Sequence, residues 1–358
     1  MTDFKEILIS HAAAYPLMKP CDGVKLVYQA TFGGGHMISD ADAAHRRIIT
    51  EYAAIPHTAA PMRVESLGDT ARVYLDGELS QYELSLIARM FCASAKRYAR
   101  GYVDADETTR LKFDERLCML GEVCKEGHFA FTPAELNAYI SEYRAAGCPA
   151  VSHSDVYRDS YLPAYRVIDS YYVRLIPALV RLTALLPSSE RVVVAIDGRC
   201  ASGKSTAARL IADVFSAETV HMDDFFLPPE LRTPERLSEV GGNLHRERFV
   251  SEVLPHLRDT GGFSYRVFEC STFSYADKPR YVAPSKLIIC EGSYALHPAF
   301  GKYYDMAIFS DVDPDEQCRR ILLRNGEYML TRFKNEWIPM EERYFEAFGI
   351  KDKCDLTI

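Results

Sequence analysis

The residues best suited to chemistry form one glycine-rich segment, Gly198-Arg199-Cys200-Ala201-Ser202-Gly203-Lys204-Ser205. The segment matches G-x-x-x-x-G-K-[ST], a pattern whose consecutive backbone N–H groups surround phosphate groups. In this pattern the lysine reaches the β- and γ-phosphates and the final hydroxyl ligates Mg²⁺. The residues expected to bind a nucleotide are therefore Gly198, Cys200, Ala201, Ser202, Gly203, Lys204, Ser205 and Thr206.

The elements on both sides of this segment are those that a phosphate loop requires. Residues 191–197 form a continuous run rich in β-branched side chains, which is typical of a buried parallel strand. Residues 204–215 carry apolar side chains at helical spacing, so the loop ends at a helix N-terminus with its positive dipole end. A chance match to the motif would not be expected to have both a strand before it and a helix after it.

Acidic residues follow two further predicted strands. Asp223 and Asp224 come directly after a short strand at 219–222, and Glu291 ends an apolar strand at 287–290 that resembles a Walker B strand. Functional groups gather at the carboxyl ends of parallel strands. We expect Asp223 to act as the catalytic base and metal ligand and Glu291 to act as a metal ligand, although helix capping would also explain acids at these places.

Arginines on a predicted helix after Asp313 are candidates for stabilising a transferred phosphoryl group. Arg320 and Arg324 are four residues apart and share one helix face. An alternative is a solvated basic face that pairs with Asp315 and Glu316.

A pocket for a phosphoryl acceptor is expected beside Asp223. Tyr265 and Arg266 lie in a predicted strand or hairpin at 262–268 and, with Asp224, are candidate substrate-binding residues. Alternatively, Tyr265 is a core residue and Arg266 is a surface residue.

Composition limits the class of protein. The chain has 358 residues, a net charge of −8 and ten cysteines without a C-x-x-C pair. This length favours two domains, and the acidic balance argues against general nucleic-acid binding. We find no signal peptide, no apolar run long enough for a membrane span and no zinc spacing, so we expect a cytoplasmic protein with reduced thiols.

The pattern of elements predicts two different halves. Residues 1–155 read as an α+β domain, with a hairpin at 63–75 and helices at 80–100, 107–126 and 132–147. Residues 156–189 read as a linker and a docking helix that spans 167–186. Residues 190–358 alternate strands and helices, with strands at 192–196, 219–222, 287–290, 306–310 and 355–358, as expected for a parallel α/β sheet.

The ordered set of motifs in the second half resembles the uridine kinase group of P-loop kinases. The set consists of the segments 197–206, 221–226, 289–292 and 318–320, and Asp223-Asp224-Phe225-Phe226 looks most like nicotinamide riboside kinases. This resemblance implies a P-loop NTPase domain with a five-stranded parallel sheet, ATP or GTP with Mg²⁺, and phosphoryl transfer to a hydroxyl of a small molecule. It also implies that Asp223 is the base, that Glu291 supports the metal, and that Arg320 and Arg324 belong to a lid.

One stretch departs from the uridine kinase pattern. The family carries an acid that holds the ribose hydroxyls, and the corresponding stretch here is Asn243-Leu244-His245-Arg246. His245 is therefore a further candidate substrate-binding residue, or an ordinary surface residue. The acceptor is accordingly left as a nucleoside-, sugar- or vitamin-like compound.

Two questions stay open from the sequence. The N-terminal half carries a glycine-rich segment, Gly33-Gly34-Gly35-His36. One interpretation is a ligand or metal site that uses His36 together with His153. The other, which we favour, is a glycine-rich turn and a histidine whose hydrogen bonds are satisfied within the protein. The alternative function is a nucleotide-dependent regulatory NTPase switch that signals through the N-terminal domain. A homodimer is compatible with the sequence.

Overall fold

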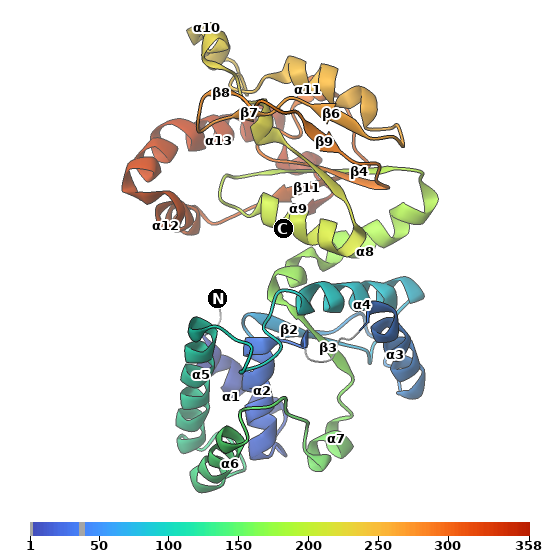
Figure 1. The fold of residues 1–358 in the computed structure, drawn as a ribbon, viewed down its shortest axis with the longest axis vertical. Helices are drawn as coiled ribbons and strands as arrows, with labels where there is room; N and C mark the ends of the chain where they lie inside the picture. The colour runs from blue at the N-terminus through green and yellow to red at the C-terminus, as the bar shows by residue number, and fades with distance from the viewer. Residues whose placement is uncertain (1–2, 36–39) are drawn as a thin grey trace. The chain divides into compact units, whose positions relative to one another are not determined.

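The computed structural model of the chain describes residues 3–35 and 40–358 (Figure 1). It divides into two compact units, Met1–Ile176 and Pro177–Ile358, which we call the N-terminal and C-terminal units. Each unit has its own buried hydrophobic cluster. Among the described residues, no helix has the length and apolar character needed to cross a bilayer.

The N-terminal unit combines helices with a small antiparallel sheet, which confirms the α+β prediction. The sheet has the order β1-β2-β3. Its strands are β1 (Val64–Ser66), β2 (Thr70–Tyr74) and β3 (Tyr165–Asp169), and its helices are α1 (Phe4–Ala14), α2 (Pro20–Phe32), α3 (Ala41–Ala54), α4 (Gln81–Ala95), α5 (Glu107–Lys125), α6 (Pro133–Ala145) and α7 (Asp155–Tyr161).

Local sequence signals place several of these elements correctly. The predicted hairpin is formed by β1 and β2, which pair antiparallel around Gly68. Helix α6 begins with the expected capping box, in which the Thr132 hydroxyl accepts the Glu135 N–H and the Glu135 carboxylate accepts the Thr132 N–H.

The helix predicted over 167–186 is wrong in its first half. Residues 165–169 form β3, which pairs antiparallel with β2, and residues 170–175 form a 3₁₀ turn. Helix α8 spans only Ile176–Leu185. Val167 and Ile168 are buried in the sheet, and this long-range pairing outweighs their helical spacing with later residues.

A buried polar network lies at the centre of the N-terminal unit. Arg72 is fully buried and donates to Gln29 Oε1 at 2.7 and 3.0 Å and to Glu65 Oε2 at 3.2 Å. Its Nη1 also lies 3.2 Å from His11 Nε2. Charged groups buried in this way are stabilised by their hydrogen-bond partners.

His153 extends the same network. Its Nδ1 lies 2.9 Å from Asp22 Oδ1 and its Nε2 lies 2.6 Å from Tyr165 Oη. Both ring nitrogens are thus used inside the protein, which agrees with the satisfied-histidine interpretation. His36 lies outside the described residues.

The C-terminal unit is built on a five-stranded parallel sheet of order β12-β11-β4-β10-β5, which confirms the predicted α/β fold class with a five-stranded parallel sheet. Its strands are β4 (Val192–Gly198), β5 (Glu218–His221), β10 (Leu287–Glu291), β11 (Met306–Ser310) and β12 (Leu356–Thr357). Its helices are α8, α9 (Lys204–Phe215), α10 (Pro234–Ser238), α11 (Arg246–Glu252), α12 (Pro314–Arg332) and α13 (Ile338–Phe348).

Short strands outside the main sheet form two antiparallel pairs. Strand β6 (Phe263–Tyr265) pairs with β9 (Arg280–Val282), and β7 (Phe268–Glu269) pairs with β8 (Ser274–Tyr275). The segment predicted as a strand or hairpin at 262–268 therefore contributes one strand to each pair. Figure 1 shows these strands and α11 grouped in the same part of the C-terminal unit.

Candidate functional site

The phosphate loop connects the middle strand β4 to helix α9. Gly198 has φ 135°, and a Cβ there would lie 2.1 Å from the Ser310 carbonyl oxygen on β11. Gly203 has φ 103° and is the N-cap residue of α9. Because both positions exclude ordinary side chains, the two glycines of the motif are required by backbone shape.

Lys204 is held over the first residues of the loop. Its ammonium group donates to the carbonyl oxygens of Gly198 at 2.7 Å and Arg199 at 2.8 Å, and the residue is only 8% exposed. The side chain is therefore positioned at the loop before any ligand arrives. A fixed cation beside the backbone N–H groups of a glycine-rich loop is the arrangement expected for binding polyphosphate.

Glu291 joins the loop to the neighbouring strand β10. Its Oε2 accepts from the Ser205 hydroxyl at 3.1 Å, and its Oε1 lies 2.6 Å from His221 Nδ1 at the end of β5. The hydrogen bond to Glu291 raises the pKa of His221. Carboxylate and hydroxyl oxygens are the ligands that Mg²⁺ prefers, so Ser205 and Glu291 fit a Mg²⁺ site.

Magnesium sites of this kind use few protein ligands. Within residues 3–35 and 40–358, no three His, Cys, Asp or Glu side chains are grouped so that they could hold a metal by themselves. Mg²⁺ bound through one or two protein oxygens and substrate phosphates does not need such a group.

Asp223 follows β5 in a 3₁₀ turn at Met222–Phe225. Its side chain is exposed to solvent, although neighbouring protein atoms crowd it and partly desolvate its carboxylate. This crowding and the negative charge of Glu291 raise its pKa, while the charge of Lys204 lowers it. The predicted site residues Asp223, Glu291 and Lys204 thus lie close enough for their charges to interact.

Asp224 and Tyr265 are hydrogen-bonded to each other, and the burial of Tyr265 agrees with the alternative that it belongs to the core. The Tyr265 hydroxyl donates to Asp224 Oδ2 at 2.8 Å, and Arg280 Nη1 lies 2.7 Å from the same oxygen. Both Asp224 and Tyr265 are buried. Their polar atoms are therefore engaged with each other, and this pair supports the segment that carries Asp223.

His245 and Arg266 also bind protein partners. The His245 N–H donates to the Phe225 carbonyl oxygen at 2.6 Å, and its Nδ1 lies 3.2 Å from Glu247 Oε2. Arg266 donates to Glu252 at 2.6 and 3.0 Å and is exposed. The structure thus places His245 beside the Asp-Asp-Phe-Phe segment and Arg266 in a surface ion pair.

The two arginines of α12 occupy different surroundings. Arg320 pairs with Glu316 and also lies 3.2 Å from the carbonyl oxygen of Ala201 and 3.3 Å from that of Ser202. Arg324 donates to Asn325 Oδ1. The next residue, Gly326, has φ 79° and ψ 173° and interrupts the helix. Arg320 therefore contacts the phosphate loop, whereas Arg324 lies at a kink.

Sequence reasoning missed two buried carboxylates. Asp197 accepts the N–H groups of Gly198, Tyr294 and Leu296 and the hydroxyl of Tyr344, at 2.7 to 3.2 Å. Burial nevertheless raises its pKa to about 6. Asp197 directly precedes the first residue of the motif, and this position could have indicated from the sequence that it helps to shape the loop.

The second is Glu341 on α13. Its Oε2 accepts the Cys200 N–H at 2.8 Å and its Oε1 accepts the Ser293 hydroxyl at 2.5 Å. No spacing in the sequence connects Glu341 with a loop about 140 positions earlier, so only the fold reveals this contact.

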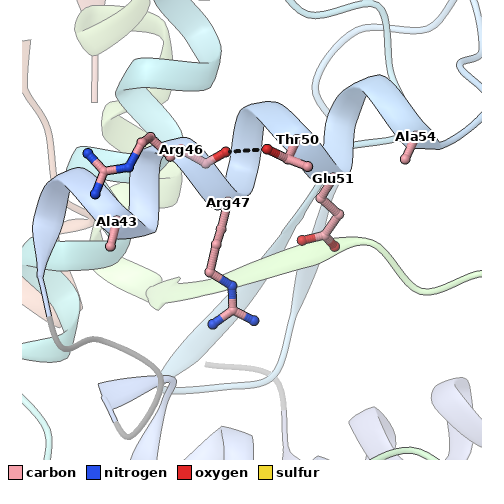
Figure 2. Close-up of a pocket in the computed structure, with 6 residues that line it drawn as sticks. All are labelled: Ala43, Arg46, Arg47, Thr50, Glu51 and Ala54. Atoms are coloured by element: carbon pink, nitrogen blue, oxygen red, sulfur yellow. Dashed lines mark hydrogen bonds between the residues drawn. The ribbon is translucent and has the colours of Figure 1, made fainter.

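A separate surface pocket of about 470 Å³ lies along α3 in the N-terminal unit (Figure 2). It is lined by Ala43, Arg46, Arg47, Thr50, Glu51 and Ala54. Thr50 Oγ1 donates to the Arg46 carbonyl oxygen, and Glu51 pairs with Arg166 at 2.6 Å. None of the residues predicted to bind nucleotide or acceptor lies in this pocket.

No family model and no curated protein matches the chain. Among solved structures, a candidate uridine kinase from Bacillus stearothermophilus matches 50% of this chain and 97% of its own, with 18% identity and a TM-score of 0.39. A candidate fructose transport system kinase from Silicibacter sp. TM1040 matches 47% of this chain and 90% of its own, with 24% identity and a TM-score of 0.41. Both matches cover about half of this chain.

Proposed function

We propose that the C-terminal unit is a Mg²⁺-dependent small-molecule kinase. It transfers the γ-phosphoryl group of ATP or GTP to a hydroxyl group of a nucleoside-, sugar- or vitamin-like compound. The supporting observation is that Lys204, the Ser205–Glu291 pair and Asp223 meet at the carboxyl ends of β4, β10 and β5. This set provides a phosphate-binding cation, metal ligands and a base.

Asp223 has the properties of the base in this reaction. As the acceptor oxygen bonds to the γ-phosphorus, the bond to the bridging oxygen breaks and a nucleoside diphosphate leaves. The carboxylate of Asp223 takes the proton of the acceptor hydroxyl. A raised pKa makes this carboxylate a stronger proton acceptor than an ordinary aspartate. Bound Mg²⁺ would neutralise charge on the phosphates.

The neighbourhood of Asp223 suits a polar acceptor. Cys270 lies within electrostatic range of Asp223, Asp224 and Arg232, and Arg280 pairs with Asp224. Charged groups therefore lie near the proposed base. Such surroundings favour a compound with several polar groups over an apolar alcohol.

Product analysis tests this proposal against the switch. The purified full chain is incubated with ATP labelled in the γ-phosphate, Mg²⁺ and a mixture of nucleosides, sugars and hydroxylated vitamins. We expect label on one organic product. Release of inorganic phosphate alone, at a rate that responds to an added protein partner, would instead support the regulatory NTPase switch.

A further inference from the structure

Glu341 occupies a place where a nucleotide-binding site ordinarily has no acid. The residue is 5% exposed, and its carboxylate accepts a backbone N–H of the phosphate loop, that of Cys200. Within the part of the chain that the structure describes, no ion pair to Glu341 is present at 4 Å or less. A buried carboxylate without a cation is costly, so its hydrogen bonds from Cys200 and Ser293 must hold it in place.

From the contacts of Lys204 we infer that the Cys200 amide faces the terminal phosphates of a bound nucleotide. The ammonium group of Lys204, which reaches the β- and γ-phosphates in such loops, contacts the carbonyl oxygens of Gly198 and Arg199 immediately before Cys200. The charge of Glu341 also raises the pKa of Asp223, the proposed base. Glu341 therefore lies near both the proposed position of the γ-phosphate and the reacting groups.

A carboxylate and a phosphate oxygen are chemically similar ligands for a backbone N–H. Both are anionic acceptors, and loop amides favour negative charge. They cannot share one donor at close range without strong repulsion, because like charges at such distances destabilise each other. A terminal phosphate must thus displace Glu341 or bind against its charge.

Building on the proposed function, we propose that Glu341 is a specificity-determining residue that sets the affinity for triphosphate relative to diphosphate. Its carboxylate accepts the Cys200 N–H until a γ-phosphate binds there. The γ-phosphate of ATP must therefore compete with the Glu341 carboxylate, whereas ADP has no γ-phosphate and does not compete with it. Displacement also breaks one of the contacts between α13 and the loop, while the Arg199–Glu342 pair and the Tyr344–Asp197 hydrogen bond remain. ATP, but not ADP, therefore changes the surroundings of α13.

Calorimetry with MgATP and MgADP tests this proposal on the full chain. Glu341→Gln removes the charge at nearly constant size, and we expect it to raise the ratio of ATP to ADP affinity by about tenfold. Glu346→Gln, an exposed acid on the same helix, is the matched control and should leave the ratio unchanged. Ser293→Ala, which removes the second hydrogen bond to Glu341, should raise the ratio by a smaller factor.

Tryptophan emission gives a readout that needs no substitution. Trp337 is the chain's single tryptophan and directly precedes α13. We expect MgATP to shift its emission and MgADP to leave it unchanged.

The outcomes separate this proposal from the proposed function. An unchanged affinity ratio in Glu341→Gln, or equal emission changes with both nucleotides, would overturn the role of Glu341 while leaving the kinase proposal intact. A Glu341→Gln protein that binds both nucleotides normally but transfers phosphate slowly would show a positioning role and also overturn it. Failure of the unmodified chain to bind either nucleotide would remove both proposals.

Discussion

Replacing Lys204 with methionine tests the nucleotide site most directly. Methionine keeps the length of the aliphatic chain and removes the ammonium group that now contacts Gly198 and Arg199. A charge pair about 4 Å apart contributes about 4 kcal/mol at an effective dielectric constant of 20. Since the ammonium group borders the solvent-facing loop, we expect a loss of about 2–4 kcal/mol in binding, or about 30- to 1,000-fold in Kd.

The assay is calorimetric titration of the purified chain with MgATP. The substitution also removes the Lys204 donor from the Gly198 carbonyl oxygen and one of two donors from the Arg199 carbonyl oxygen, which also accepts the Ser202 N–H; the loss costs about 1–3 kcal/mol of stability. Thermal unfolding must therefore be measured in parallel, and titrations must be made well below the transition. Lys302→Met is the matched control, because Lys302 is exposed and precedes β11, at the edge of the sheet opposite the loop.

If folded Lys204→Met bound MgATP within about threefold of the unmodified chain, the ammonium group would contribute less than about 0.7 kcal/mol. The loop would then not be the phosphate-binding element. Equal losses in Lys204→Met and Lys302→Met would show a general effect of net charge.

The remaining predictions concern the base, the loop backbone and the buried network. Asp223→Asn should keep nucleotide affinity and slow phosphoryl transfer by about 10²–10⁴-fold; transfer at the unmodified rate would remove the proposed base. Gly198→Ala should destabilise the unit by more than about 2 kcal/mol in denaturant unfolding, because its Cβ would meet Ser310 at 2.1 Å. Gly301→Ala, at φ 62° but with no atom within 4 Å of the Cβ, should cost clearly less, and equal costs would show that φ strain alone matters. Burial lowers the pKa of His153 from 6.5 to about 4, so folding favours its neutral form; its contribution is complete above pH 6.5 and declines towards pH 4. His153→Gln should flatten this decline in pH-dependent unfolding, and an unchanged profile would contradict the pKa shift.

The sequence was sufficient for the sheet and the phosphate loop because both depend on local patterns. The apolar run of β4, the two motif glycines and the helix that follows lie within about 25 residues of each other. Strands β10 and β11 were found for the same reason, since each is a short buried run.

Features that depend on long-range pairing were not predictable in this way. Strand β3 looked helical because its partner β2 lies about 95 residues earlier. The contacts of Glu341 and the pairing of Arg266 with Glu252 depend on where distant segments pack. Their residue types are ordinary on any protein surface, so no local signal distinguishes them.

The buried carboxylate of Asp197 has a consequence for how the site is assembled. Its hydroxyl partner, Tyr344, is 147 positions later in the chain, and Glu341 is equally remote from Cys200. During synthesis the loop emerges long before the helix that completes its surroundings. Contacts with such large sequence separation form slowly. A ribosome-bound chain that has made strand β11 but not α13 would therefore carry the phosphate-binding motif without the hydrogen bonds from Tyr344 and Glu341.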